Sequence, residues 1–373
     1  MFFCRILDVG GLERHWASLL PALQSAGLPC HLVTVKGDGR ALKSVQDAGV
    51  EVTVLEQKGI PAFRELPLLT IRRLLSLLTQ KRPSVIVSGS YGDILVAAMY
   101  SRLTRTPHVI NWHRQPGFRG TANHERAVSF AGAFGAGAIS VSESQRDDLR
   151  GFRIPDTRIA IVSNGVNGPS GPYPPKDNLR KELGLPKGRR LVTLLARLRP
   201  EKCVSNFLRA ISDLDARGLP ISGLVVGDGP MEQELRSEAS SLRAPVTFVG
   251  YQKDPYPYLI ASDMACLTSD FEALPMSLLE AASCGIPCVA TDVGGTREII
   301  DDQVTGLIVP PGDIPALSLA IERLALDDEG RRSMGERSRL RWQDLFSFEH
   351  MVTEYLRLLT SVSGPPTTWE NKQ

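Results

Sequence analysis

The chain has 373 residues, enough for two domains that each bury a core of their own. Its 43 basic and 41 acidic residues give a formal net charge of +2, which argues against nucleic acid as a partner, because proteins that bind phosphate backbones usually carry a strong basic excess. The amino terminus shows no basic leader or cleavage site, so we expect a cytoplasmic protein with its six cysteines reduced.

Short β-branched runs alternate with helical patterns along the first half, which predicts a parallel sheet built from βαβ units. A short first strand falls within "FFCRIL". The helical stretch 63–83 has leucines on one side and basic residues elsewhere, so it fits either a helix lying on an anionic bilayer or one whose leucines pack on the sheet. The βαβ position favours the second interpretation. The further strands predicted here are 30–35, 50–55, 84–88, 108–112, 138–142 and 158–162.

Glycine and proline crowd residues 163–178, so we expect no regular element there and interpret the stretch as a linker. The same alternation then restarts and ends with an amphipathic helix at 348–362. The predicted strands of this half are 190–196, 221–227, 245–250, 263–269, 287–292 and 306–310. The expected organisation is a domain at 1–166, a domain at 176–345, a helix at 346–363 that packs back on the first domain, and a disordered tail at 364–373.

The loops after the strands are the first places to look for a site, because ligands of open parallel sheets bind beyond the carboxyl ends of the strands. After the strand at 190–196, Arg197 and Lys202 stand five residues apart at a strand-to-helix junction. Two cations so placed can clamp an anion, or they can belong to a solvated basic loop. The spacing alone leaves both interpretations open.

The stretch "SDFEALPMSLLEAASCGIP" places Glu272 and Glu280 on either side of a helix start, with Pro275 as the expected first helical residue. The free amides of Leu274, Met276 and Ser277 would then suit a phosphate. Glu280 stands in an apolar run and needs a partner. A nucleoside diphosphate sugar would supply one, with Glu280 at the ribose and Glu272 at the hexose. Arg197 or Lys202 would supply another, and spacing does not decide between them.

Several motifs resemble one family. Residues 269–313 look like the signature region of the retaining nucleotide-sugar glycosyltransferases of family four, including their E-x7-E motif. "GGLERH", "VSESQRDDL", "SNGV", "ARLRPEK" and "VVGDGPMEQEL" match the family pattern in its order. The resemblance implies the α/β GT-B fold, in which two Rossmann-like domains face each other across a cleft. It also implies a nucleotide-sugar donor in the carboxy-terminal domain, an acceptor in the amino-terminal one, and no cofactor or divalent metal.

The resemblance also implies roles for individual residues. Arg197 and Lys202 would neutralise the donor diphosphate, Glu272 would contact the sugar, and Glu280 would bind the ribose. The glycine turn before the first helix would face the phosphates and acceptor, and the base would lie after the strand at 245–250. The predicted catalytic residues are Glu272, His113, Lys202 and Arg197. The predicted donor-binding residues are Gly10, Gly11, Arg197, Lys202, Gly250, Tyr251, Glu272, Ala273, Leu274, Pro275, Met276 and Glu280.

The leading hypothesis is transfer of a hexose to a hydroxyl of a glycan or lipid-linked acceptor, with retention of anomeric configuration and a same-face substitution. A lipid-linked acceptor would go with peripheral contact at the cytoplasmic membrane face. A GT-B sugar-nucleotide epimerase would instead convert the donor without an acceptor. An NAD-dependent oxidoreductase would need G-x-G-x-x-G, whereas "VGDGPM" breaks off at Met231. A non-catalytic binding module is the third alternative. Two departures from the family pattern are the short first strand and Asn167, where aspartate is usual.

Overall fold

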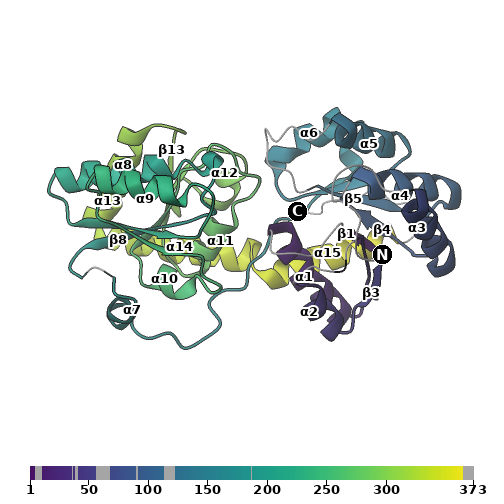
Figure 1. Ribbon diagram of the computed structural model, residues 1–373, viewed down its shortest axis with the longest axis horizontal. Helices are drawn as coiled ribbons and strands as arrows, with labels where there is room; N and C mark the ends of the chain where they lie inside the picture. Colours follow the sequence, from purple (N-terminus) through teal and green to yellow (C-terminus); the bar gives the residue numbers. More distant parts are fainter. Residues whose placement is uncertain are drawn as a thin grey trace. The chain divides into compact units, whose positions relative to one another are not determined.

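The computed structural model describes residues 1–4, 11–35, 37, 41–55, 68–89, 91–112, 122–185 and 187–363. The chain divides into two compact units (Figure 1). Unit 1 is Met1–Ser163 together with the carboxy-terminal residues from Met351 onward, and unit 2 is Asn164–His350. Each unit contains its own parallel sheet with helices on both faces, so the two Rossmann-like domains of the predicted GT-B fold are present.

Unit 1 contains a parallel sheet of seven strands in the order β3-β2-β1-β4-β5-β6-β7. Its strands are β1 (Phe2–Cys4), β2 (His31–Thr34), β3 (Glu51–Val54), β4 (Ile86–Ser88), β5 (His108–Trp112), β6 (Gly137–Ser140) and β7 (Ile159–Ile161). Its helices are α1 (Gly11–Ser25), α2 (Leu42–Asp47), α3 (Leu68–Lys81), α4 (Tyr91–Thr104), α5 (Ala122–Ala133), α6 (Arg146–Gly151) and most of α15 (Phe348–Val362).

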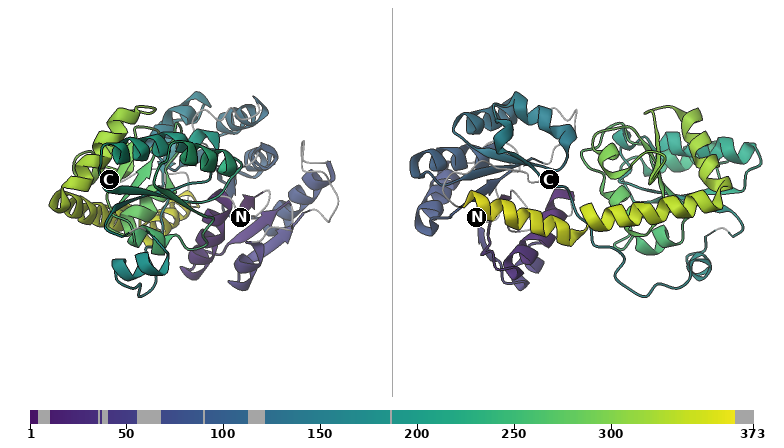
Figure 2. Two further views of the ribbon diagram at one scale, coloured as in Figure 1. Left: turned by 60° about the vertical axis from the view of Figure 1, so that its left-hand side comes forward. Right: turned by 180° about the vertical axis from the view of Figure 1, so that it is seen from behind.

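Helices α3, α4 and α5 cover one face of this sheet, and α1, α2 and α15 cover the other (Figures 1 and 2). Leu74 and Leu78 of α3 are buried in a cluster with Ile86 of β4 and Val96 of α4. The leucine side of the predicted membrane-binding helix therefore packs on the sheet, as expected of a βαβ crossover. Residues 63–67 of that prediction lie outside the described residues.

Unit 2 contains a parallel sheet of six strands in the order β10-β9-β8-β11-β12-β13. Its strands are β8 (Arg190–Leu195), β9 (Ile221–Val226), β10 (Val246–Gly250), β11 (Met264–Leu267), β12 (Cys288–Thr291) and β13 (Gly306–Val309). Its helices are α7 (Lys176–Glu182), α8 (Val204–Ala216), α9 (Glu232–Ser241), α10 (Tyr256–Ile260), α11 (Met276–Ser283), α12 (Thr296–Ile299), α13 (Ile314–Leu326) and α14 (Asp328–Leu345).

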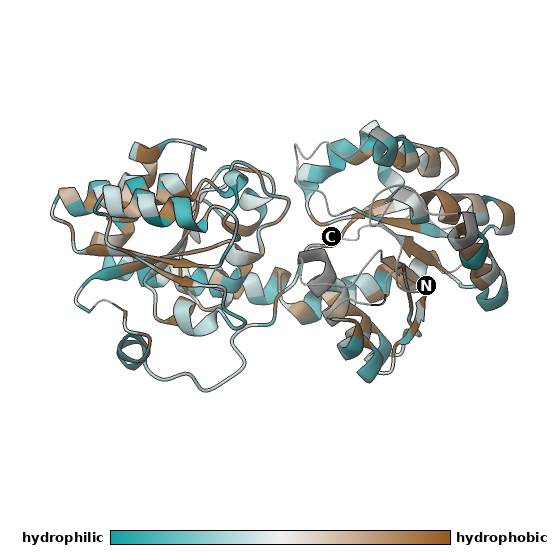
Figure 3. Ribbon diagram, viewed as in Figure 1, coloured by the Kyte–Doolittle hydropathy of each residue, from teal (hydrophilic) through white to brown (hydrophobic). Residues whose placement is uncertain are grey.

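The core of unit 2 follows from the sequence pattern. Helix α8 buries Val204, Phe207, Leu208 and Ile211, which recur at helical spacing and pack on strands whose side chains are buried on both faces. In Figure 3 the strands of both units are mainly hydrophobic, and the outer sides of the helices are mainly hydrophilic. Every strand predicted after the first is present to within two residues at each end.

The predicted linker is partly wrong. Its last three residues belong to α7, which begins at Lys176. The Lys176 ammonium donates hydrogen bonds to Asp263 Oδ1 at 2.7 Å and to the carbonyl of Ser262 at 2.5 Å, and the Tyr173 hydroxyl donates to Asp254 at 3.1 Å. The end of this glycine- and proline-rich segment is therefore attached to unit 2 by side-chain contacts that its composition does not indicate.

Candidate active site

The strand order of unit 2 places two loops side by side. Strand β8 pairs with β9 on one side and with β11 on the other, so the chain reverses its direction of winding at the β8–β11 boundary. Such a reversal opens a crevice at the carboxyl ends of the two central strands. The loop after β8 carries Arg197 and Lys202, and the loop after β11 carries Glu272. Topology thus brings together residues about seventy positions apart.

Lys202 and Glu272 form the central contact of the site. The Lys202 ammonium lies 2.6 Å from Glu272 Oε1, and Glu272 is only 5% exposed. A carboxylate so buried costs several kcal/mol unless a cation or hydrogen-bond donors compensate it. The sequence led us to look for the partner of Glu280, but Glu272 is the more deeply buried carboxylate, and Lys202 forms its ion pair with Glu272. The alternative that Lys202 pairs with Glu280 is therefore wrong.

The two oxygens of Glu272 are not equivalent. The hydroxyl of Ser269, itself buried, donates to Glu272 Oε1 at 2.7 Å, the same oxygen that Lys202 contacts. Within the described part of the chain, no residue hydrogen bonds to Oε2. One oxygen is therefore held by the protein, and the other keeps its capacity to accept hydrogen bonds from a ligand. Lys202 likewise spends one of its three N–H donors on this pair.

Two hydrogen bonds to backbone carbonyls connect the two loops. The Thr268 hydroxyl donates to the carbonyl of Lys202 at 2.9 Å, and the amide of Asp270 donates to the carbonyl of Glu201 at 2.9 Å. Cys203, between the 3-10 turn that carries Lys202 and helix α8, has a left-handed φ of 47°. These contacts fix the position of Lys202 before any ligand binds, which is what an electrostatic site requires.

Helix α11 begins one residue later than predicted. Pro275 has an extended conformation (ψ 112°) and caps the helix, whose first residue is Met276. The turn before it is packed against the 292–296 loop: the amide of Gly295 donates to the carbonyl of Ala273 at 3.0 Å. At Gly294, with φ +49°, a Cβ atom would stand 1.7 Å from the carbonyl oxygen of Glu272. Only glycine fits there, and it fixes the backbone that carries Glu272.

Glu280 lies farther along α11 and is half-buried. Its charge raises the pKa of Tyr256 and, together with burial, raises the pKa of the Cys284 thiol to about 12; burial is the larger cause for both groups. Glu280 therefore lies near Tyr256 and Cys284. Its neighbourhood differs from that of Glu272, as expected if the two carboxylates contact different parts of one elongated ligand.

Arg197 is exposed, and no described carboxylate pairs with it. The glycine loop after β9 supports this loop from behind, since the carbonyl of Asp228 accepts from the amide of Leu198 at 2.7 Å. A Cβ at Gly227 would stand 1.9 Å from the carbonyl oxygen of Ala196, and one at Gly229 would stand 2.3 Å from that of Leu198. The glycines of "VGDGPM" are thus explained by close loop packing rather than by a dinucleotide.

Some of the other predicted site residues lie among the described residues, and two lie outside them. Gly11 is the first residue of α1. Gly250, with φ +69°, is the last residue of the edge strand β10, and the exposed Tyr251 follows it. Gly10 and His113 lie outside the described residues. Leu274 and Pro275 are buried beneath the turn, whereas Met276 is partly exposed. In the described residues, no group of three or more His, Cys, Asp or Glu is arranged to hold a metal.

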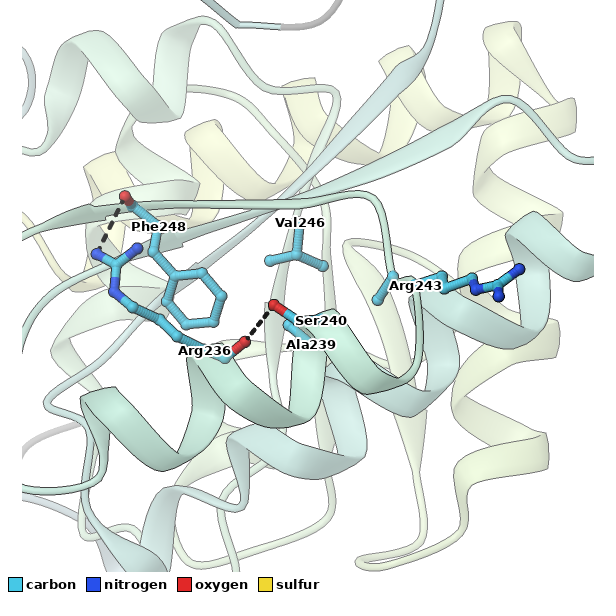
Figure 4. A pocket seen from close by; sticks show the side chains of 7 residues that line it. Arg236, Ala239, Ser240, Arg243, Val246 and Phe248 are labelled. Carbon is cyan, nitrogen blue, oxygen red and sulfur yellow. Dashed lines mark hydrogen bonds between the residues drawn. The ribbon is translucent and has the colours of Figure 1, made fainter.

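A shallow hollow of about 330 Å³ lies between α9 and β10, and none of the predicted site residues lines it. Figure 4 shows the Arg236 guanidinium over the Phe248 ring, 4.9 Å from its centroid, and Arg243 directed away from the hollow. Arg236 also donates to the carbonyl of Phe248 at 3.4 Å. The basic side chains here are occupied with the protein or with solvent, so this hollow does not compete with the β8–β11 crevice as a candidate site.

Sequence reasoning missed Ser269, Thr268 and Thr291. The Thr291 hydroxyl donates to the carbonyl of Ser269 at 2.7 Å, and so holds the residue that holds Glu272. The one signal in the sequence is the spacing of three between Ser269 and Glu272 in "SDFE". A serine three residues before a carboxylate is common in loops, and only the burial of both side chains gives the spacing its meaning.

Comparison with known proteins identifies the family and the fold. The model of Glycosyltransferase Family 4 matches residues 9–167, and the model of Glycosyl transferases group 1 matches residues 175–341. The chain is 32% identical over 224 residues to N-acetyl-alpha-D-glucosaminyl L-malate synthase of Bacillus anthracis, which is 58% of this chain and 57% of that protein. It thus spans about half the length of that relative. It is 27% identical over 355 residues to 2-deoxystreptamine N-acetyl-D-glucosaminyltransferase of Streptomyces fradiae, covering 87% of this chain and 84% of the relative.

Among solved structures, Anabaena HepE in complex with UDP superimposes with a TM-score of 0.83 at 20% identity, covering 96% of this chain and 99% of that one. The fold is therefore GT-B, with two Rossmann-like parallel-sheet domains. The chain belongs to the family-four glycosyltransferases, whose two family models together match nearly all of it.

Proposed function

We propose that the chain transfers a hexose-type sugar from a nucleoside diphosphate donor to a hydroxyl of a glycan or lipid-linked acceptor, with retention of anomeric configuration. The observation that carries the proposal is the contact between Lys202 and Glu272 at the β8–β11 crevice. It provides a partly buried cation for a diphosphate and a carboxylate oxygen for a sugar hydroxyl, side by side and already fixed.

The chemistry of this contact suits a leaving diphosphate. Negative charge grows on the phosphates as the bond to the sugar breaks, and the remaining N–H donors of Lys202 with the exposed guanidinium of Arg197 would stabilise it. Among the described residues, no side chain accepts a capping hydrogen bond in the first turn of α11, so the free amides of this turn would donate to the same anion. Glu272 Oε2 would accept from a sugar hydroxyl, Glu280 would bind the ribose, and the base would lie near Gly250 and Tyr251.

We further propose a same-face substitution in which the donor phosphate accepts the proton of the acceptor hydroxyl. Glu272 has one oxygen engaged by Lys202 and Ser269, so it is built to orient the sugar rather than to attack its anomeric carbon. His113 and the turn at Gly10 and Gly11 would contact the sugar and phosphates from unit 1. No metal is assigned to the reaction, and turnover that survives chelation with EDTA would support that assignment.

A thermal-shift screen across uridine, guanosine and adenosine diphosphate sugars tests the donor class. A ligand at a hundred times its Kd adds roughly 2.7 kcal/mol of stability, which is readily seen as a rise in Tm. The uridine series comes first, because HepE is described in complex with UDP. Lys202→Ala serves as the matched control and should abolish the shift. A wild-type protein that shifts with none of these donors would contradict the proposal.

The anomeric configuration of the product, read by nuclear magnetic resonance, distinguishes retention from inversion. The sugar-nucleotide epimerase alternative predicts conversion of the donor in the absence of any acceptor. Incubating donor alone and donor with a panel of sugar acceptors therefore separates the two activities in one experiment.

A further inference from the structure

Unit 1 carries an exposed apolar surface on the helix layer formed by α4 and α5. We call it the α4–α5 face and define it by Met99, Leu103, Phe130 and Phe134. Their exposed fractions are 54%, 82%, 38% and 38%. Met99 and Leu103 are one helical turn apart, as are Phe130 and Phe134, whose ring centroids lie 4.5 Å apart. The two helices share one buried cluster and lie next to each other on the sheet, so these exposed side chains belong to one helix layer.

The core does not need these side chains. The contact between the two helices and the sheet is made by another stripe, which includes Ile94 and Ala98 of α4 and Ala127, Val128 and Ala131 of α5. All five of these residues are fully or almost fully buried. The α4–α5 face therefore points away from the sheet, and its apolar area is a cost that a purely structural helix layer would avoid.

The charges around this face have one sign. Arg102, Arg105 and Arg126 are exposed, and none of them forms a side-chain hydrogen bond or an ion pair with any described residue. The acidic residues of the two helices are Asp93, which is buried, and Glu125, which is half-buried. The exposed part of the face thus combines apolar side chains with uncompensated cations.

We propose that the α4–α5 face docks unit 1 on an anionic lipid bilayer. Phenylalanine and leucine side chains enter the boundary between headgroups and acyl chains, while arginines beside them attract acidic headgroups. A second copy of the chain is a poor occupant, because a two-fold interface would set the same three arginines against one another. In the described residues, no helix is both long and apolar enough to cross a bilayer, so the contact would be peripheral.

The position of the face fits this role. Met99 and Leu103 lie in the second half of α4, Phe130 lies in the last turn of α5, and Phe134 directly follows this helix. In a βαβ unit the helix starts at the carboxyl edge of the sheet and runs back toward the amino edge. Docking through the helix ends therefore leaves the carboxyl edge of the sheet, with its loops, uncovered. This surface is also distinct from α3, whose leucine side packs on the sheet.

Co-sedimentation with vesicles tests the proposal directly and requires no sugar donor. The wild-type chain should bind vesicles of phosphatidylcholine that contain about 30–40% phosphatidylglycerol, and it should bind pure phosphatidylcholine far less. Binding to the anionic vesicles should weaken as added salt screens the charges. Each arginine near an anionic surface contributes about fivefold to partitioning, so Arg102→Gln/Arg105→Gln/Arg126→Gln should weaken it roughly a hundredfold. Leu103→Ser/Phe130→Ser should weaken it at least about tenfold.

Leu319→Ser/Arg332→Gln, which removes an exposed leucine and an exposed arginine of unit 2, is the matched control and should bind like the wild type. Unchanged Tm values establish that the variants fold. Equal binding to neutral and anionic vesicles, or binding that the α4–α5 variants leave intact, would overturn the proposal. So would light scattering that shows a wild-type dimer which the same variants dissociate, because the face would then be an interface between two copies.

Discussion

The two units share a parallel-sheet design but stabilise their buried polar groups differently. Unit 1 contains two buried neutral pairs: His15 Nε2 lies 3.2 Å from the Tyr355 hydroxyl, and the Ser88 hydroxyl lies 2.7 Å from His108 Nε2. Burial lowers the pKa of His15 to about 4 and that of His108 to about 3, so both imidazoles are uncharged at neutral pH. No comparable buried histidine occurs among the described residues of unit 2.

Unit 2 instead buries ion pairs. Asp263, at the start of β11, accepts from Lys176 at 2.7 Å, from Arg180 at 2.7 Å and from the amide of Leu191 at 2.7 Å. Burial by itself raises the pKa of Asp263, but these partners lower it, and the net shift is downward. Glu272 and Lys202 repeat the arrangement at the other end of the same central strands. The unit expected to bind a charged donor is thus the one that contains fixed, paired charges.

The largest expected effect concerns the ion pair between Lys202 and Glu272 in unit 2. Replacing Lys202 by alanine should lower turnover about a thousandfold or more, because it removes the partly buried cation that would stabilise the leaving diphosphate. The measurement is kcat with the donor found in the thermal-shift screen. Arg199→Ala removes an exposed cation of the same loop, which has no described partner, and should change kcat less than about twofold. Turnover of the Lys202 variant within tenfold of wild type would show that the pair is structural only.

The next effect concerns stability. Asp263→Ala leaves Lys176 and Arg180 without their shared anion and should cost unit 2 about 3–5 kcal/mol. Hydrogen exchange followed by mass spectrometry reports the two units separately and should show the loss in unit 2 alone. Asp328→Ala removes a more exposed carboxylate that pairs with Arg190 and Arg331, and should cost about 1 kcal/mol or less. Equal losses of stability in the two variants would contradict the expectation that the buried ion pairs of Asp263 contribute more than the exposed ones of Asp328.

Lowering the pH should destabilise unit 1 more than unit 2. His15 and His108 have folded-state pKa values below that of an exposed histidine, so the unfolded chain binds their protons first as pH falls. Stability of unit 1 should be complete above about pH 6.5 and should fall toward pH 4, by about 2 kcal/mol per histidine at pH 5. Asp263 stays ionised at pH 5, so unit 2 should change little. Hydrogen exchange at pH 7.5 and pH 5 measures both, and parallel losses would refute the contrast.

The smallest effect concerns the second contact of Glu272. Ser269→Ala removes the hydroxyl that holds Oε1 and should lower kcat about tenfold while leaving UDP affinity unchanged, because the carboxylate would contact the sugar and not the nucleotide. Ser283→Ala is the matched control, since that buried hydroxyl donates to the backbone carbonyl of Glu280 and forms no hydrogen bond with Glu272. If UDP affinity falls in step with kcat, Ser269 supports the loop as a whole rather than positioning Glu272.

Much of the fold could be predicted because its signals are local. Strands such as β9 are continuous apolar runs, and helices such as α8 repeat buried residues at helical spacing. The site was only partly predictable. Lys202, Glu272 and Glu280 stand out through the resemblance of their motifs, but the contact between Lys202 and Glu272 depends on β8 and β11 being neighbours, which no local pattern encodes. The burial of Glu272 beneath Gly294 depends on a third loop.

The packing of Gly294 against the carbonyl of Glu272 determines which positions near the proposed sugar contact can be varied and which cannot. A library that varies Gly294 would displace the carboxylate in nearly every member, since any side chain there collides with backbone. Phe271, beside Glu272, is 46% exposed, and Met276 is also accessible, so these two positions accept substitution at little structural risk. Directed evolution of the proposed activity should hold Gly294 constant and randomise Phe271 and Met276.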